Sequence, residues 1–139
     1  MTYIVASLVE RGASGVSRSS HEAFRHGADL VEVRLDHMAL RKVGAEALSE
    51  VREAVRGPAV ATLRSSAEGG RSRLSGAARE KALRAVLGAG FEYVDLELGT
   101  DARLLGELRR RKHRPAVIAS SHLRAPAACL VAKDRMLGQ

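Results

Sequence analysis

The stretch Asp-Leu-Val-Glu-Val-Arg-Leu-Asp at residues 29–36 decides the fold that this sequence predicts. Apolar and polar side chains alternate along it with a period of two, which is typical of a β-strand. One face is wholly apolar and carries Val31, Val33 and Leu35. The other face carries Leu30, Glu32, Arg34 and Asp36. Charges within a sheet are costly unless they are paired or face a polar cavity. The stretch therefore predicts a sheet with an apolar outer face and a polar inner pocket.

Four further stretches are expected to be strands, and every strand is followed by an expected helix. The strands are residues 3–8, 58–64, 92–98 and 115–122, and the helices begin near Ser19, Glu46, Ser75, Thr100 and Ala125. Ser19 and Glu22 have the spacing of a capping box, which places the first helix after a loop at 12–18. Such strict alternation with short loops requires parallel strands joined by right-handed crossovers.

Two α/β architectures fit five β-α units: part of a (β/α)8 TIM barrel, or a five-stranded open doubly wound sheet. Strands of a doubly wound sheet are covered on both faces and are apolar on both. Here one face carries polar groups near the strand ends, where barrel enzymes gather their catalytic residues. These are Ser7, Glu32, Arg34, Arg64, Asp95, Glu97 and His122. We therefore expect residues 1–139 to form a single domain, a partial barrel, because a full barrel takes at least about 200 residues.

The composition narrows the class of partner. The net charge of +7 favours an anionic partner. Aromatic residues are scarce and none lies in a basic cluster, which argues against nucleic acid. The basic run 109–114 is better explained as the C-terminus of a helix, where cations favour the helix dipole. No apolar run is long enough for a membrane span, so we expect a cytoplasmic protein with no membrane association. Exposed edges of a partial barrel predict a homodimer or self-association.

The polar face suits acid–base chemistry on a small anion. Arg34 and Arg64 suit a substrate carboxylate or a set of hydroxyls. His122, at the end of a strand, is a candidate proton shuttle. The alternative is structural, with Glu32 paired to Arg34 and Asp95 paired to Arg64. A metal site would draw on Asp36, His37, Asp95, Glu97 and His122, but their spacing is not that of a tight ligand set. The single Cys129 excludes an internal disulfide.

Five stretches occur in a characteristic order: residues 4–8, 27–36, 61–64 with Glu68-Gly69-Gly70, 93–98, and 118–122 followed by Pro126. Together they resemble type I 3-dehydroquinate dehydratase, the Schiff-base dehydroquinase of the shikimate pathway. The resemblance implies a (β/α)8 barrel and a lyase that converts 3-dehydroquinate to 3-dehydroshikimate in aromatic amino acid and chorismate biosynthesis. It implies no metal and no cofactor.

The same resemblance assigns roles to residues. His122 would donate and accept the proton. The substrate would be bound by Ser7, Glu32, Val33, Arg34 and Arg64, with Glu68, Asp95 and Glu97 as supporting groups. The family forms an imine with a lysine on the sixth strand, and this chain is expected to end before that strand. Its lysines are expected outside the rim, and they are Lys42, Lys81, Lys112 and Lys133.

Three hypotheses for the function follow. The first is the N-terminal part of a 3-dehydroquinate dehydratase, truncated and inactive alone because it lacks the imine lysine. The second is an inactive remnant or a small-anion binding protein. The third is a half-barrel that pairs with a second copy of itself. A metal-dependent barrel isomerase, or a nucleic-acid binder, is a distant fourth.

Overall fold

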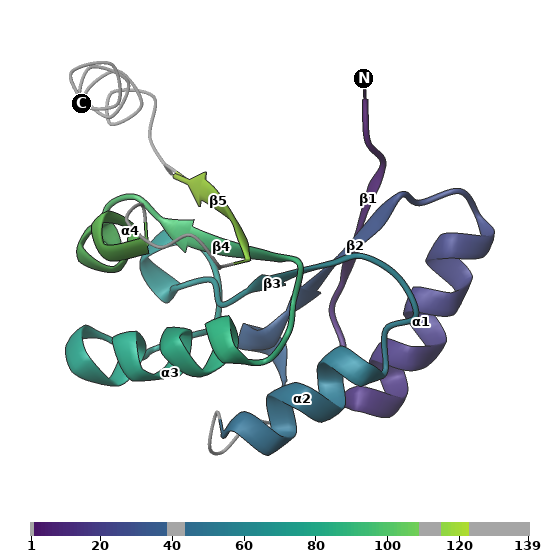
Figure 1. Cartoon of the computed structure of the whole chain (residues 1–139), viewed down its shortest axis with the longest axis horizontal. Coiled ribbons are helices and arrows are strands. Elements are labelled where there is room, and N and C mark those ends of the chain that lie inside the picture. Colours follow the sequence, from purple (N-terminus) through teal and green to yellow (C-terminus); the bar gives the residue numbers. More distant parts are fainter. Residues whose placement is uncertain (1, 39–43, 109–114, 123–139) are drawn as a thin grey trace.

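The structure, a computed structural model, describes residues 2–38, 44–108 and 115–122 (Figure 1). Five strands form one parallel sheet in the order β1-β2-β3-β4-β5. They are β1 (Val5–Leu8), β2 (Leu30–Arg34), β3 (Ala59–Thr62), β4 (Tyr93–Glu97) and β5 (Ala116–Ser120). The helices between them are α1 (Ala13–Arg25), α2 (Ala45–Glu53), α3 (Gly76–Gly88) and α4 (Ala102–Leu108). Two short 3-10 helices, η1 (Leu35–His37) and η2 (Ser66–Glu68), follow β2 and β3.

The strand order decides between the two predicted architectures. A doubly wound sheet reverses its strand order at a switch point, which places helices on both faces. Here every strand pairs with its neighbours in sequence, and Figure 1 shows α1, α2 and α3 on the same side of the sheet. The chain is therefore an α/β protein with the arrangement of a partial barrel, and the doubly wound alternative is wrong.

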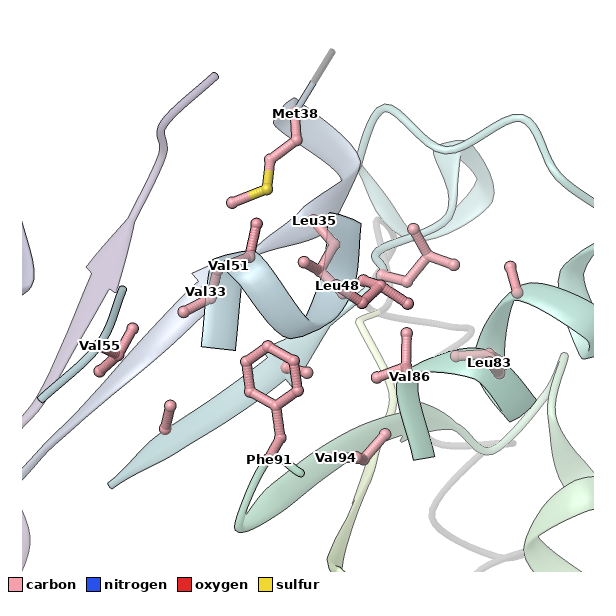
Figure 2. Close-up of a cluster of buried hydrophobic side chains, with 14 of the residues drawn as sticks. Val33, Leu35, Met38, Leu48, Val51, Val55, Leu83, Val86, Phe91 and Val94 are labelled. Carbon is pink, nitrogen blue, oxygen red and sulfur yellow. The ribbon is translucent and has the colours of Figure 1, made fainter. Parts of the chain in front are cut away.

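The apolar core lies between the outer face of the sheet and the helices. Val31 and Val33 of β2 and Val94 of β4 are fully buried there. Figure 2 shows side chains of α2 and α3 gathered with Phe91 over this face, among them Leu48, Val51, Leu83 and Val86. Since Glu32 and Arg34 of β2 are only partly buried on the opposite face, the predicted alternation is confirmed over Leu30–Arg34. Leu35 and Asp36 lie in η1 instead of the predicted strand.

The first helix differs from the prediction, because it begins at Ala13 rather than near Ser19. Val16 is fully buried, so the extra turns cover apolar surface that a loop would leave exposed. The hydroxyl of Ser19 donates to Glu10 Oε1 at 2.5 Å, and Glu10 packs against Gly15. Ser19 thus lies inside the helix, and the predicted capping box with Glu22 is wrong. The helix expected near Ala125, the run 109–114 and Cys129 lie outside the described residues.

The register of the parallel strands aligns the polar side chains of the inner face. Ser7 is level with Glu32, and Arg34 is level with Thr62. Asp95 is level with Thr62 in turn. Because the strands are parallel, their carboxyl ends meet at one edge, which we call the rim. No helix among the described residues is long and apolar enough to cross a membrane.

Candidate functional site

Arg64, directly after β3, is the centre of the rim. Its side chain is only 7% exposed, although it carries a full charge. One guanidinium nitrogen lies 2.9 Å from Asp95 Oδ2. The other donates to Ser120 Oγ at 2.9 Å and lies 3.2 Å from Glu68 Oε2 and 3.5 Å from Glu97 Oε1. The structure thus gathers around one arginine the three supporting acids predicted from the sequence.

His122 lies beyond the end of β5, with a side chain that is 55% exposed. Its backbone N–H donates to Glu68 Oε2 at 2.9 Å, and its ring Nδ1 is 3.4 Å from the same oxygen. That oxygen also faces Arg64, so Glu68 connects the two residues. A carboxylate beside one ring nitrogen fixes the orientation of an imidazole. The ring is thus held beside Glu68, with more than half of its side chain exposed at the mouth of the rim.

Arg34, the last residue of β2, is oriented by a buried aspartate two residues later. Its Nε and one terminal nitrogen donate to the two oxygens of Asp36, each at 2.9 Å. Asp36 Oδ2 also accepts the backbone N–H of Arg71 at 3.0 Å, which ties the loop after η2 to the end of β2. Burial alone would raise the pKa of Asp36, but the hydrogen bonds from Arg34 and Arg71 hold it below its usual value. Asp36 is thus a fixed negative charge that positions Arg34.

At Asp95 the opposing influences on the pKa balance the other way. Burial raises the pKa of its carboxyl above the usual value, and the charge of Glu32 acts in the same direction. A hydrogen bond with Ser120 and the charges of Arg64 and His122 oppose that rise without cancelling it. A raised pKa in a cluster of titratable groups is common at functional sites, although structural ion pairs produce it too.

The remaining predicted residues divide between the two faces of the sheet. On the inner face, Ser7 Oγ donates to Glu32 Oε2 at 2.6 Å, in a more exposed part of the rim. The side chain of Val33 is fully buried in the outer core, so only its backbone is available to a substrate. Of the two structural pairs considered from the sequence, the pair of Asp95 with Arg64 is formed at 2.9 Å. The other is not, because Arg34 binds Asp36 rather than Glu32.

One rim residue, Thr62, and one residue of the outer layer, Arg79, were not recognised from the sequence. Thr62 Oγ1 is buried and has no hydrogen-bond partner in the part of the chain that the structure describes. Thr62 follows Val60 and precedes Arg64 on the inner face, so strand alternation alone would have found it. Arg79 was also missed, because it lies on a helix of the outer layer.

Residues 2–38, 44–108 and 115–122 include the five residues on which a metal site could draw. Within these ranges no cluster of three His, Cys, Asp or Glu side chains has the geometry to hold a metal ion. Lys81, the lysine within these ranges, is exposed on α3 and is not at the rim. Lys42, Lys112 and Lys133 lie outside the described residues.

The sequence matches the model of one protein family, described as type I 3-dehydroquinase, over residues 4–128. Among curated proteins, it is 33% identical over 125 residues to a 3-dehydroquinate dehydratase of Methanosarcina barkeri, covering 86% of this chain and 50% of that one. It is 34% identical over 113 residues to a 3-dehydroquinate dehydratase of Methanothermobacter thermautotrophicus, covering 78% of this chain and 50% of that one. The chain thus spans about half the length of the curated relatives it matches.

Solved structures agree on the fold. The crystal structure of 3-dehydroquinate dehydratase from Geobacillus kaustophilus superposes with a TM-score of 0.74 at 24% identity, over 97% of this chain and 56% of that one. The 3-dehydroquinate dehydratase of Aquifex aeolicus superposes with a TM-score of 0.56 at 29% identity, over 78% of this chain and 47% of that one. The five strands and four α-helices of the described residues therefore have the fold of about half of such a protein.

Proposed function

We propose the function of this chain from the family to which it belongs, the type I 3-dehydroquinase family. Residues 1–139 are proposed to be the N-terminal portion of a 3-dehydroquinate dehydratase barrel. This portion would supply the groups that bind 3-dehydroquinate and move its protons as water is lost. The proposed location is the cytoplasm, with a small-molecule substrate and no nucleic-acid partner.

One observation carries the proposal: a single oxygen of Glu68 faces both Arg64 and His122. A general acid or base must be held within hydrogen-bond reach of the group it serves. Through Glu68, the proposed proton-transfer residue His122 keeps a defined place beside the proposed substrate-binding residue Arg64. Asp95 and Glu97 hold Arg64 from its other side.

The substrate would be bound at the inner face of the sheet. Arg34 and Arg64 provide the positive charge that a carboxylate requires. Glu32 and Ser7 provide a carboxylate and a hydroxyl, which suit the hydroxyl groups of a polyhydroxylated ring. Val33 would contribute through its backbone alone.

Binding of the substrate analogue quinate tests the first half of the proposal. We expect the full chain to bind quinate, measured by calorimetry, and Arg34→Met to weaken binding at least about tenfold, because a charge-assisted contact is worth about 1.5–3 kcal/mol. Arg84→Met is the matched control, since Arg84 pairs with Glu80 and Glu107 on the outer helices. Absence of quinate binding, or equal weakening by both substitutions, would contradict the proposal.

Imine trapping with 3-dehydroquinate and borohydride tests whether a lysine of this chain forms a covalent imine with the substrate. A lysine nucleophile needs a desolvated pocket that lowers its pKa, and exposed Lys81 has none. We expect binding without a trapped adduct on Lys81, read from the intact mass and checked with Lys81→Arg. An adduct abolished by Lys81→Arg would show that this lysine reaches the substrate.

The second candidate, a small-anion binding protein, is favoured by the position of Lys81 away from the rim. The two candidates differ in selectivity. A dehydroquinase rim should prefer quinate over a simple dicarboxylate such as succinate, because Glu32 and Ser7 recognise hydroxyl groups. Equal affinity for the two would favour the second candidate.

A further inference from the structure

Arg79, in the first turns of α3, is a buried arginine that no proposed role has used. Its side chain is only 2% exposed. Nε and one terminal nitrogen donate to the two oxygens of Asp101, each at 2.8 Å, and the other terminal nitrogen donates to the carbonyl of Leu63 at 2.9 Å. Burial would lower the pKa of Arg79, but Asp101 raises it above its ordinary value, so the group remains charged.

The charge of Arg79 reaches the rim through Glu97. The terminal nitrogen that donates to Asp101 lies 3.3 Å from Glu97 Oε2. The other oxygen, Oε1, accepts the backbone N–H of Ser65 at 2.7 Å and lies 3.5 Å from Arg64. Asp101 in turn accepts the backbone N–H of Glu97 at 2.9 Å. Glu97 is therefore held between one arginine of the outer layer and one arginine of the rim.

We propose that Arg79, held by Asp101, is a positioning residue for the rim. Arg79 shares the carboxylate of Glu97 with Arg64, and Arg64 therefore stays directed at Asp95 and Ser120. This inference rests on the proposed function only in treating Arg64 as a substrate-binding residue.

The reason lies in how buried charges are balanced. Glu97 is 1% exposed, and a buried carboxylate needs a cationic partner. Without Arg79, Arg64 would be the one cationic partner of Glu97 and would move toward it, away from Asp95. The hydrogen bond from Arg79 to the carbonyl of Leu63 fixes the backbone next to Arg64 as well. The planar fork of an arginine serves three acceptors at once, which a lysine ammonium on its flexible stem does not reproduce.

The test compares two charge-conserving variants on the same helix, Arg79→Lys and Arg84→Lys. The readout is the titration of the Asp95 carboxyl, followed by its carbon chemical shift, with quinate affinity measured alongside. If Arg64 moves toward Glu97, Asp95 loses a neighbouring cation, and we expect its pKa in Arg79→Lys to rise by about one unit. Quinate affinity should fall at least about fivefold. Arg84→Lys should leave both unchanged.

Asp101→Asn gives a second and opposite signature. With one acidic partner gone, Arg79 turns more fully to Glu97, which releases Arg64 to Asp95, so the pKa of Asp95 should fall. A merely structural role predicts no such change of sign. A folded Arg79→Lys protein that titrates like the wild type would overturn the proposal, as would shifts of the same sign in both variants. Should Arg79→Lys fail to fold, the Asp101→Asn shift decides alone.

The two proposals fail in different ways. If the wild-type chain does not bind quinate, the proposed function fails, while the titration of Asp95 still decides the role of Arg79. If quinate binds but Asp95 titrates identically in all variants, the inference about Arg79 fails and the proposed function stands.

Discussion

The two ends of the sheet both carry an arginine paired with acids of β4 or its flanks, yet they are built differently. At the amino end, Arg52 donates to Glu92 and to the carbonyls of Gly90 and Val55. The second oxygen of Glu92 accepts the backbone N–H of Ala59 at 2.9 Å. One cation thus pairs with one carboxylate. This Arg52–Glu92 pair, which we call the staple, joins α2, β3 and β4.

At the carboxyl end the charges are shared. Arg64 forms ion pairs with Glu68, Asp95 and Glu97 and donates a hydrogen bond to the hydroxyl of Ser120. The pKa values record the contrast. Burial would raise the pKa of Glu92, but Arg52 and the N–H of Ala59 bring it below its usual value, whereas that of Asp95 stays raised. A closed pair stabilises the fold, while groups that share partners are able to exchange them for a ligand.

Removal of the rim cation should have the largest effect. In Arg64→Met, the buried carboxylates of Asp95 and Glu97 lose their common partner. We expect the free energy of unfolding to fall by about 3–5 kcal/mol, because one member of a buried charge network is gone. Chemical denaturation measures this loss, and quinate binding should disappear. A loss below about 1 kcal/mol would mean that the rim charges are not balanced through Arg64.

Crowding the loop beside Arg64 should come next. A Cβ on Gly70 would lie 2.2 Å from the carbonyl oxygen of Arg64 and 2.5 Å from its Cβ, so backbone would have to move. We expect Gly70→Ala to lower the free energy of unfolding by about 1–3 kcal/mol and to weaken quinate binding. Gly88, at the end of α3, has open space around its Cα, and Gly88→Ala is the control, expected to leave binding unchanged. Equal effects of the two substitutions would refute the close approach at Gly70.

Weakening the staple at the amino end should affect stability alone. Glu92→Gln keeps an acceptor for the N–H of Ala59 but removes the charge that faces Arg52. We expect a loss of about 1 kcal/mol, because Glu92 is partly exposed. Thermal denaturation measures the loss, and quinate affinity is the control. A clear loss of affinity would show that the two ends are coupled and would end the comparison.

The smallest effect should be a difference in pH dependence between two rim acids. The folded pKa of Asp36 is lowered, so its charge stabilises the protein above the unfolded value of about 3.9, and this contribution disappears as the pH falls through the lower folded pKa. The stability difference between wild type and Asp36→Asn should therefore close in acid. Asp95 has a raised pKa, so its ionisation destabilises the fold, and that penalty is relieved as the pH falls.

Denaturation curves between about pH 3 and pH 7 measure both contributions. The matched variant is Asp95→Asn. If the stability differences of both variants changed with pH in the same direction, the two carboxyl groups would not differ as the structure implies.

Much of the fold and part of the site were open to prediction. Alternation in residues 29–36 identified both faces of β2, and the same reasoning placed Arg64, Asp95 and Glu97 on the inner face. The capping-box reasoning failed at α1, because Ser19 donates to Glu10 from within the helix and Val16 becomes buried only when the first turns pack against the rest of the fold. Arg79 had a visible signal, since it continues the buried stripe of Ala82, Leu83 and Val86, where a charge requires a partner.

The sequence by itself determined which side chains face inward, since the period of a strand is a local property of its backbone. It also determined that the strands are parallel, because a helix long enough to return the chain separates each strand from the next. Only the tertiary structure decided how the charges are shared: that Arg34 binds Asp36, that Glu68 joins Arg64 to His122, and that Arg79 reaches Glu97 from the outer layer. Buried charges take partners by distance in space, and those distances exist only after the strands and helices have packed.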